Sequence, residues 1–345
     1  MSSSSPSPSQ PLVEIRDLHV RFSGRGSEVR AVNGVDLSVG RGEVLALIGE
    51  SGSGKSVTLR SILRLNPEQR TKVTGSIHVD GTDVLAMNRR ALADFRGKTA
   101  AMIFQEPLTA LDPVYTLGEQ IVETIRRHES VSRDQARARA LSLFERVRIP
   151  SPSRRLDTYA HEMSGGMRQR AMIALALACS PKLLLADEPT TALDATVQIQ
   201  VLLLLRELQR ELGLAIIFVT HDLGAAVEVA DRIAVMYGGR IVESGSTRQI
   251  IQSPSHPYTL ALLRSRAHGA MKRGEPLVAI AGSPPDLARL PPGCAFADRC
   301  SWAQAECRQS VPKATLIDTG HTASCLRTQA VRLSSTSAAH SQHST

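Results

Sequence analysis

Apolar and polar positions divide the chain into short strand-like runs and longer helical segments. Residues 12–22 alternate between apolar and polar side chains, which predicts a strand with one exposed face. Residues 44–48 are all apolar, as is typical of a central strand that is covered on both faces. Further strands are predicted within 182–189, 214–222 and 232–245, with helices between them. This alternation predicts an α/β core with a largely parallel sheet.

Turn and proline signals complete the map of elements. An Asp-Gly pair predicts a hairpin within 76–84. Residues from about 116 to 178 are predicted to be mostly helical, with arginine-rich faces. Prolines mark the entry to another helix in 253–266, whereas the proline-rich stretch 281–293 predicts irregular structure.

Shifts in composition predict the limits of the domains. We expect a main domain over 12–255, a smaller C-terminal domain over 256–328, and disordered tails over 1–11 and 329–345. The N-terminal tail lacks the basic and apolar regions of a signal peptide, and no uncharged apolar stretch is long enough to span a membrane. We therefore expect a soluble protein, or one that reaches a membrane by binding a protein in it.

The charge and the cysteine content narrow the partners and the compartment. The 345 residues carry a formal net charge of +8, but the arginines are scattered and aromatic residues make up only 3%. Platforms for stacking bases are therefore not expected, and we predict no nucleic-acid partner. Five cysteines, an odd number, favour a reducing compartment over a disulfide framework.

A glycine-rich segment, GESGSGKS, predicts a phosphate-binding loop. It fits the pattern G-x-x-x-x-G-K-[ST] between an apolar strand and a helix, so that successive N–H groups form a nest for anions. Lys55 is expected to reach the β- and γ-phosphates, and the Ser56 hydroxyl to ligate Mg²⁺. The residues predicted to bind nucleotide here are Gly49, Glu50, Ser51, Gly52, Ser53, Gly54, Lys55, Ser56 and Val57.

Two acids at the end of a later strand complement this loop. Four apolar residues precede Asp187 and Glu188. We expect Asp187 to hold Mg²⁺ through water, and Glu188 to orient or deprotonate an attacking water. Such a pair alone is usually a solvated strand end, but beside a phosphate loop it indicates nucleotide hydrolysis.

With MSGGMRQR, residues 163–170, the sequence resembles the ATP-binding subunit of an ABC transporter. The resemblance implies a P-loop NTPase core of the ABC type, with antiparallel β and helical subdomains, the latter over about 107–180. It also implies that this signature loop closes in trans over the γ-phosphate held by a partner subunit, so that two subunits enclose two ATP molecules. The residues that match the signature are Ser164, Gly165, Gly166 and Met167.

Other elements of this family follow in the matching order. Gln105 in IFQEP resembles the glutamine that touches Mg²⁺ and the water, and His221 in VTHD resembles the histidine that contacts the γ-phosphate. Asp194 in TALD resembles the aspartate at the subunit contact, and Phe22 resembles the aromatic residue that stacks on adenine. Taken singly, each has an ordinary structural interpretation, and only the ordered set favours the family roles.

One branch of the family resembles the chain most. Methionine at position 167, where glutamine is frequent, and the phrases SVTLRSIL, ADEPTTALD and HPYTLALL resemble the dipeptide and oligopeptide importers, and the likeness covers about 12–328. It implies a peripheral ATPase on the cytoplasmic face of the bacterial inner membrane, which drives two permeases fed by a solute-binding protein. A second, different ATPase subunit is the expected partner. Dipeptides, oligopeptides, nickel chelates and glutathione all stay open as solutes.

Three other classes of protein fit less well. A soluble ABC ATPase of DNA repair or translation usually carries coiled-coil inserts or two fused cassettes. A non-enzymatic regulator would be expected to lose Glu188 or His221. An exporter cassette is the runner-up, but the absence of fused transmembrane segments and the C-terminal cysteines favour import.

Four cysteines gather near the C-terminal end, at Cys294, Cys300, Cys307 and Cys325. Their spacing, C-x5-C-x6-C-x17-C, is wider than the pairs typical of zinc sites, and it leaves zinc, an iron–sulfur cluster and metal-free thiols open. The pattern GCAFADRC resembles the C-terminal region of peptide-importer ATPases, which implies a [4Fe-4S] cluster that orders the segment. Cys179 lies in an apolar helical run and is predicted to be a buried apolar residue.

Overall fold

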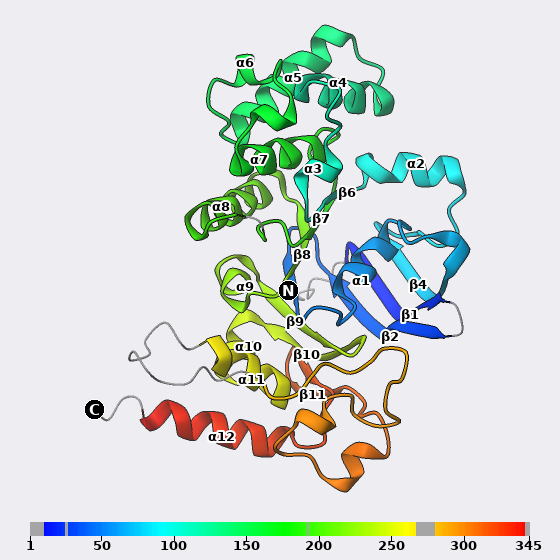
Figure 1. Ribbon diagram of the computed structural model, residues 1–345, viewed down its shortest axis with the longest axis vertical. Helices are drawn as coiled ribbons and strands as arrows, with labels where there is room; N and C mark the ends of the chain where they lie inside the picture. The colour runs from blue at the N-terminus through cyan, green and yellow to red at the C-terminus, as the bar shows by residue number, and fades with distance from the viewer. Residues whose placement is uncertain (1–9, 25–26, 192, 267–279, 342–345) are drawn as a thin grey trace, which may run out of the picture. The chain divides into compact units, whose positions relative to one another are not determined.

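The computed structural model describes residues 10–24, 27–191, 193–266 and 280–341 (Figure 1). The chain forms two compact units, each assembled from separate stretches of sequence. Within the described residues, the first comprises 10–14, 37–44 and 77–219, and the second comprises 15–36, 45–76 and 220–341, apart from the gaps just given. Residues 1–9 of the predicted N-terminal tail lie outside the described residues.

One sheet has four strands, in the order β2-β1-β4-β5. Its strands are β1 (Val13–Ser23), β2 (Glu28–Val39), β4 (Thr71–Val79) and β5 (Thr82–Asp83). β4 and β5 pair in antiparallel fashion, and the turn residues Asp80 and Gly81 have φ values of 50° and 77°. Two positive φ values are typical of the tight hairpin turn that Asp-Gly favours, so the predicted hairpin is confirmed.

The first unit contains three parallel strands whose residues are all buried. They are β6 (Ala100–Ile103), β7 (Leu183–Asp187) and β8 (Ala215–Thr220). The register sets Ile103 of β6 opposite Ala186 of β7, and Asp187 opposite Val219 of β8. Complete burial is expected of strands covered on both faces. Strands β7 and β8 were predicted within 182–189 and 214–222, whereas β6 was not predicted.

Helices form most of the remaining first unit (Figure 1), and the helices Leu117–His128 and Arg133–Arg146 each begin with a capping box. The Thr116 side chain accepts a hydrogen bond from the Glu119 N–H, and Ser132 does the same for Gln135. The predicted helical character of residues 116–178 is therefore confirmed. The helices are α2 (Arg89–Lys98), α3 (Pro107–Ala110), α4 (Leu117–His128), α5 (Arg133–Arg146), α6 (Pro152–Arg155), η2 (Ala160–Glu162), α7 (Gly165–Ala176) and α8 (Ala195–Leu212).

The second unit holds the strands that flank the phosphate loop, in the order β11-β12-β10-β9-β3. Strands β3 and β9 are parallel, whereas β10 is antiparallel to both β9 and β12. The predicted strand region 232–245 therefore folds back on itself, at Gly238 and Gly239, which have φ values of 56° and 79°. The strands are β3 (Val44–Ile48), β9 (Arg232–Tyr237), β10 (Arg240–Ser246), β11 (Thr315–Asp318) and β12 (His321–Ala323).

The helices of the second unit include the one predicted in 253–266, while 281–293 is irregular as expected. They are α1 (Lys55–Ile62), η1 (Glu68–Arg70), α9 (Leu223–Val229), α10 (Thr247–Gln252), α11 (Pro257–Arg266), η4 (Ala297–Arg299), η5 (Ala305–Arg308) and α12 (Thr328–Ser341).

Helix α12 corrects the prediction that residues 329–345 are disordered. Residues up to Ser341 are helical, and α12 packs against α11. The physical reason is Val331, which is fully buried and gives the helix an apolar contact that its Ser- and Ala-rich composition did not predict. Residues 342–345 of that predicted tail lie outside the described residues.

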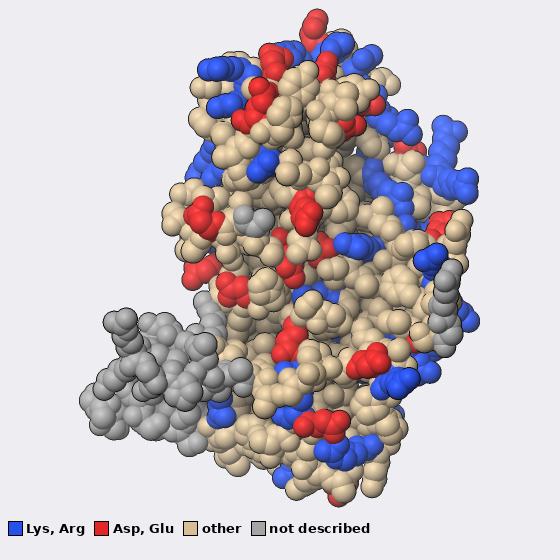
Figure 2. Space-filling view, viewed as in Figure 1, with Lys and Arg blue, Asp and Glu red and all other residues tan. Residues whose placement is uncertain are grey.

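No helix in the described ranges is long and apolar enough to cross a membrane. Positive and negative side chains are interspersed on the face shown in Figure 2. On this face, the net positive charge is not gathered into one continuous basic surface.

Candidate functional site

The loop between β3 and α1 requires glycine at two positions. A Cβ atom at Gly49 would lie 2.2 Å from the carbonyl oxygen of Met236, and one at Gly54 would lie 2.4 Å from that of Ala31. Gly54 also has a φ of 104° and precedes the first residue of α1. The loop backbone thus approaches its neighbouring strands too closely for any side chain, as the phosphate-loop pattern predicted.

The Lys55 side chain lies inside this loop. It is 4% exposed, and its Nζ donates hydrogen bonds to the carbonyl oxygens of Gly49 at 2.7 Å and Glu50 at 2.9 Å. The ammonium group can exchange these carbonyls for phosphate oxygens of a bound nucleotide. The nearby Ser53 hydroxyl is buried without a hydrogen-bond partner among the described residues. Ser51 and Gly52 are exposed, and Ser56 and Val57 are half-buried.

One contact of the loop was not predicted. The Glu50 carboxylate accepts two hydrogen bonds from Arg299, at 2.6 and 3.0 Å. The two residues are 249 positions apart, and no spacing rule connects them. The one available signal was the place of Arg299 directly before Cys300, within the pattern GCAFADRC.

Strand register brings Gln105 and Glu188 together in the first unit. The two residues follow the paired ends of β6 and β7, and Nε2 of Gln105 donates to Oε2 of Glu188 at 3.4 Å. The Thr191 hydroxyl donates to the same oxygen at 2.8 Å. The Glu188 carboxylate is therefore oriented by two side chains, which is consistent with the predicted roles of Gln105 and Glu188 around one water.

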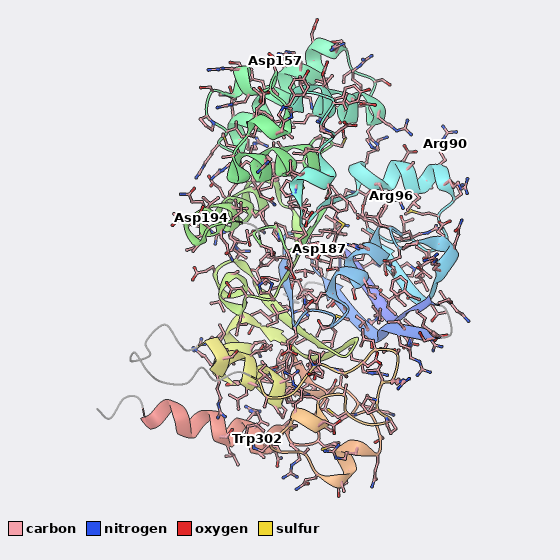
Figure 3. All side chains as sticks on the ribbon, viewed as in Figure 1. Arg90, Arg96, Asp157, Asp187, Asp194 and Trp302 are labelled. Carbon is pink, nitrogen blue, oxygen red and sulfur yellow. The ribbon has the colours of Figure 1, made fainter. Side chains whose placement is uncertain are left out.

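The backbone at the end of β7 is strained. Asp187, labelled in Figure 3, is 1% exposed as the last residue of β7. The following residue, Glu188, has a φ of 47°, a left-handed conformation that glutamate rarely adopts, and its N–H donates to the carbonyl oxygen of Val219 at 3.1 Å. Strain of this kind is concentrated at functional sites.

The signature segment and the predicted subunit-contact aspartate both begin helices. Ser164 caps α7 by accepting from the Met167 N–H at 3.4 Å, and Asp194 (Figure 3) caps α8 by accepting from the Val197 N–H at 3.0 Å. A Cβ atom at Gly166 would lie 2.8 Å from Val197. The two helix N-termini are therefore packed tightly together, and the Ser164 side chain is exposed.

The remaining predicted nucleotide contacts lie in the second unit. His221 is exposed between β8 and α9, and Phe22 is half-buried near the end of β1. Their contacts with the γ-phosphate and with adenine stay predictions.

The four C-terminal cysteines border one cavity. Its lining includes Cys294, Cys300, Cys307 and Cys325. His256 also borders it; burial lowers the pKa of this histidine to about 3, so its ring is neutral and accepts the Tyr258 N–H at Nδ1.

The thiols of this cavity are surrounded by backbone donors. The N–H groups of Phe296, Trp302 (Figure 3) and Arg327 each donate to the cysteine sulfur two residues earlier, the last at 3.2 Å. Burial, and then the other three cysteines, raise the pKa of Cys325 to about 12. Burial also raises the pKa of Cys294 and Cys300, so the thiols of Cys294, Cys300 and Cys325 need a cation nearby to become thiolates at neutral pH.

No three His, Cys, Asp or Glu side chains in the described part of the chain come close enough to hold a single metal ion. All five cysteines are free of disulfides. Cys179 is buried, as predicted, and burial raises the pKa of its thiol.

Two family models match the chain. The ABC transporter model matches residues 32–191, and the model for the oligopeptide/dipeptide transporter C-terminal region matches residues 242–307.

Three relatives illustrate the similarity. A Brucella melitensis protein, by name a peptide import ATP-binding protein, is 48% identical over 333 residues, 93% of this chain and 98% of its own. From Bacillus subtilis, the oligopeptide transport ATP-binding protein OppD is 46% identical, with coverage of 91% and 88%, and the dipeptide transport ATP-binding protein DppD is 44% identical, with coverage of 92% and 94%.

Solved structures agree on the fold. A dimeric ATP-binding cassette in a post-hydrolysis state, bound to ADP and Pi, has a TM-score of 0.62 at 28% identity and covers 68% of this chain and 99% of its own. The cbiO1 protein of Clostridium perfringens, part of an ABC transporter complex, has a TM-score of 0.60 at 26% identity, with coverage of 70% and 90%. The α/β fold is that of an ABC ATPase cassette, and the chain belongs to the ABC transporter family as an ATP-binding subunit of the oligopeptide and dipeptide type.

Proposed function

We propose that the chain hydrolyses ATP to drive the import of peptides through a membrane transporter. The observation that carries hydrolysis is the Glu188 carboxylate, which Gln105 and Thr191 orient directly after the buried Asp187. The names of the relatives, OppD and DppD among them, support peptides as the solute class.

The site residues have separate roles in hydrolysis: some bind the phosphates, some would hold Mg²⁺, and one activates water. The nest of N–H groups and Lys55 bind the β- and γ-phosphates, and neutralise charge as it develops on the leaving oxygens. Ser56, Gln105 and Asp187 would hold Mg²⁺, which would supply positive charge to offset the charge of the phosphates. Glu188 acts as the general base toward water, and His221 contacts the γ-phosphate.

We further propose that two subunits enclose the nucleotides. The exposed Ser164 and the α7 N-terminus would meet the γ-phosphate bound by a partner, with Asp194 at the contact. The dimeric cassette among the similar structures supports this arrangement. The partner is a second, different ATPase subunit, and the helical region over about 107–180 contacts the permeases at the cytoplasmic face of the bacterial inner membrane. A solute-binding protein outside delivers the peptide.

The substitution Glu188→Gln tests the catalytic assignment. The variant keeps shape and hydrogen bonding but removes the base, so we expect ATP binding to persist while turnover falls by about 100-fold or more. The matched control is Glu211→Gln, on an α8 side chain that is 51% exposed and lies 3.8 Å from Arg146. Turnover of Glu188→Gln at the wild-type rate would show that Glu188 is not the base.

We also propose that the four C-terminal cysteines hold a [4Fe-4S] cluster. A cluster spreads its four ligands around a volume, and the four thiols border one pocket with N–H groups aimed at three sulfurs. A single zinc ion needs ligands that converge on one point, and within the described residues no such group of three is found. When bound, the cluster would order the irregular segment 281–293 next to it.

Anaerobic purification tests this cofactor. We expect iron and acid-labile sulfide in the purified chain, and absorbance at the blue edge of the visible range. Serine substitution of Cys300 should reduce both, whereas serine substitution of Cys179, which is buried elsewhere, should leave them unchanged. Zinc without iron, or neither metal after anaerobic preparation, would refute the cluster.

A further inference from the structure

Arg299 links the cysteine-bearing segment to the phosphate loop. Its Nη1 donates to Oε2 of Glu50 at 2.6 Å, and its Nη2 donates to Oε1 at 3.0 Å. The Arg299 side chain is 5% exposed and that of Glu50 is 26% exposed. Paired, charge-assisted hydrogen bonds of this geometry are among the strongest polar contacts in proteins. The second residue of the phosphate loop is thus held by a cation from the far end of the chain.

The guanidinium of Arg299 uses its full set of donors. Besides Glu50, it donates to the Tyr237 hydroxyl at 3.1 Å and to the carbonyl oxygens of Ile280 at 3.1 Å and Ala281 at 2.8 Å. It also lies 5.8 Å from the ring centre of Tyr237 and 5.9 Å from that of Phe296. Five hydrogen bonds match the five N–H groups that arginine carries, and lysine has only three. Glu50 also raises the pKa of Arg299, so its charge is permanent.

The backbone around Arg299 is set by the cysteines. The Ala297 N–H donates to the Cys294 carbonyl at 3.0 Å, the Cys300 N–H donates to the Ala297 carbonyl at 3.3 Å, and the Cys294 N–H donates to the Cys307 carbonyl at 2.7 Å. Arg299 ends the short helix η4 inside this turn, directly before Cys300. Its position therefore depends on the conformation of the cysteine segment.

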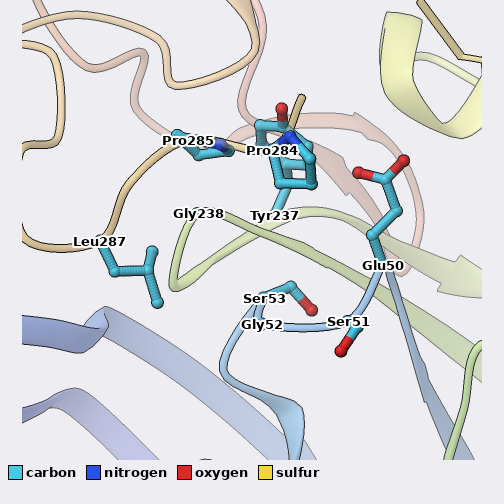
Figure 4. A pocket seen from close by; sticks show the side chains of 9 residues that line it. All are labelled: Glu50, Ser51, Gly52, Ser53, Tyr237, Gly238, Pro284, Pro285 and Leu287. Atoms are coloured by element: carbon cyan, nitrogen blue, oxygen red, sulfur yellow. The ribbon is translucent and has the colours of Figure 1, made fainter. Parts of the chain in front are cut away.

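Helix α11 and the irregular segment 281–293 also contact the phosphate loop. The Glu50 N–H donates to the Tyr258 hydroxyl at 2.8 Å. Pro284, Pro285 and Leu287 face residues 51–53 across a cavity of about 200 Å³ (Figure 4). The Leu287 carbonyl in turn accepts the N–H of Arg30, on β2, at 3.0 Å. The irregular segment 281–293 is thus packed beside the loop, and Arg299 of the cysteine-bearing segment adds a charged contact with Glu50.

We propose that Arg299 is a positioning residue of the nucleotide site, which holds and neutralises Glu50 so that ATP affinity depends on the cysteine-bearing segment. Without the arginine, a free carboxylate would lie in the loop that receives the triphosphate and would repel it. The inference rests on the proposed ATP-binding function of the same loop, and it goes further by assigning a residue outside the nucleotide motifs.

A double-mutant cycle on the full chain tests the proposal, with ATP and Mg²⁺ as the probe and calorimetry as the measurement. We expect Arg299→Ala to weaken ATP binding by roughly 3- to 10-fold, and to raise KM with a smaller change in kcat. Glu50→Gln alone should bind ATP more tightly than wild type, because the substitution removes a negative charge from the loop that receives the triphosphate. The double variant should recover most of the lost affinity, because the unpaired carboxylate is gone.

Two further variants keep the test decisive. Arg299→Lys retains the charge but not the five contacts, so its affinity should lie between those of wild type and Arg299→Ala. Arg308→Ala removes an arginine from the same segment, whose side chain is 57% exposed and pairs with Asp298 at the surface. Its ATP affinity should equal that of wild type. If Arg299→Ala does not fold, Arg299→Lys and Glu50→Gln carry the comparison.

The outcomes separate the inference from the function on which it rests. Wild-type chain that binds no ATP would refute the proposed function. Wild type that binds ATP, with Arg299→Ala binding equally well, would refute the inference alone. An Arg299→Ala defect that Glu50→Gln leaves unrelieved would indicate a general structural role, which also contradicts positioning through Glu50.

Discussion

At the scale of single residues, local pattern predicted the motifs but not the long-range pairs. The spacing of GESGSGKS predicted where glycine is needed, and close approach to Met236 and Ala31 explains why. The Arg299–Glu50 pair could not be predicted in this way, because the two residues are 249 positions apart. No sequence motif contains both of them. Such contacts depend on the tertiary fold alone.

Asp80 shows how one side chain makes stability depend on pH. The hydrogen bond from Lys182, and then that from Arg41, lower the pKa of Asp80 below its ordinary value of 3.8. The carboxylate therefore stabilises the fold above that value, and its contribution is lost as the pH falls through the lower, folded-state pKa. We expect Asp80→Asn, which keeps the turn geometry, to lower the free energy of unfolding by up to about 1 kcal/mol at pH 7.

The pH profile checks this assignment. Urea unfolding from pH 7 downward should show a constant gap between wild type and Asp80→Asn until about pH 4.5, and a shrinking gap below pH 4. Asp94→Asn is the control, because Asp94 is 59% exposed and lies 3.9 Å from Lys98. A gap that widens toward acid would contradict the stated sign.

At the scale of elements, the presence of a strand or helix was easier to predict than its first and last residues. Continuous apolar runs predicted β3, β7 and β8, because such runs fit strands buried on both faces. The prediction of disorder after residue 328 was wrong for α12, since composition does not register a buried side chain such as Val331, which stabilises the helix. The limits of the main and C-terminal domains stay predictions.

A buried carboxylate joins three elements of the second unit. Glu243 of β10 accepts the N–H groups of Ser255 at 2.7 Å and His256 at 2.9 Å, at the start of α11, and contacts Nε2 of His321 on β12 at 2.8 Å. The side chains of Glu243 and His321 are 0% and 2% exposed. We expect Glu243→Ala to lower the free energy of unfolding by about 3 kcal/mol or more, because it leaves three buried donors unpaired.

Denaturant unfolding measures this loss. Glu228→Ala, on the exposed side of α9, is the control and should change the free energy of unfolding by less than about 0.5 kcal/mol. Equal stability of the two variants would show that the Glu243 contacts are not needed to join β10, α11 and β12.

At the scale of the whole molecule, the α/β class followed from the alternation of strands and helices, and the family from the ordered motifs. The division into two discontinuous units could not be predicted in this way. The periodicity of apolar residues is local and does not indicate which distant stretches of sequence share a core. Assembly with a partner subunit is likewise a property of surfaces, and it was predicted from the resemblance alone.

The proposed assembly gives a prediction at this scale. With ATP, the Glu188→Gln chain should associate with its partner ATPase into a species of about twice the mass, because hydrolysis no longer separates the subunits. Adding Ser164→Ala should weaken that association while ATP binding to each separate chain persists. Light scattering after size exclusion, with and without ATP, measures both. Association that is independent of ATP would contradict a nucleotide-enclosing dimer.

The contact between Glu50 and Arg299 has a consequence for synthesis in the cell. The phosphate loop leaves the ribosome early, but Arg299, which holds Glu50 of that loop, is translated 249 residues after Glu50. At typical elongation rates, that delay is roughly 10 to 50 seconds. During this interval the nascent chain carries a loop without its counter-charge. Nearly the whole polypeptide must therefore be translated before the loop is complete, and incomplete chains would be poor competitors for cellular ATP.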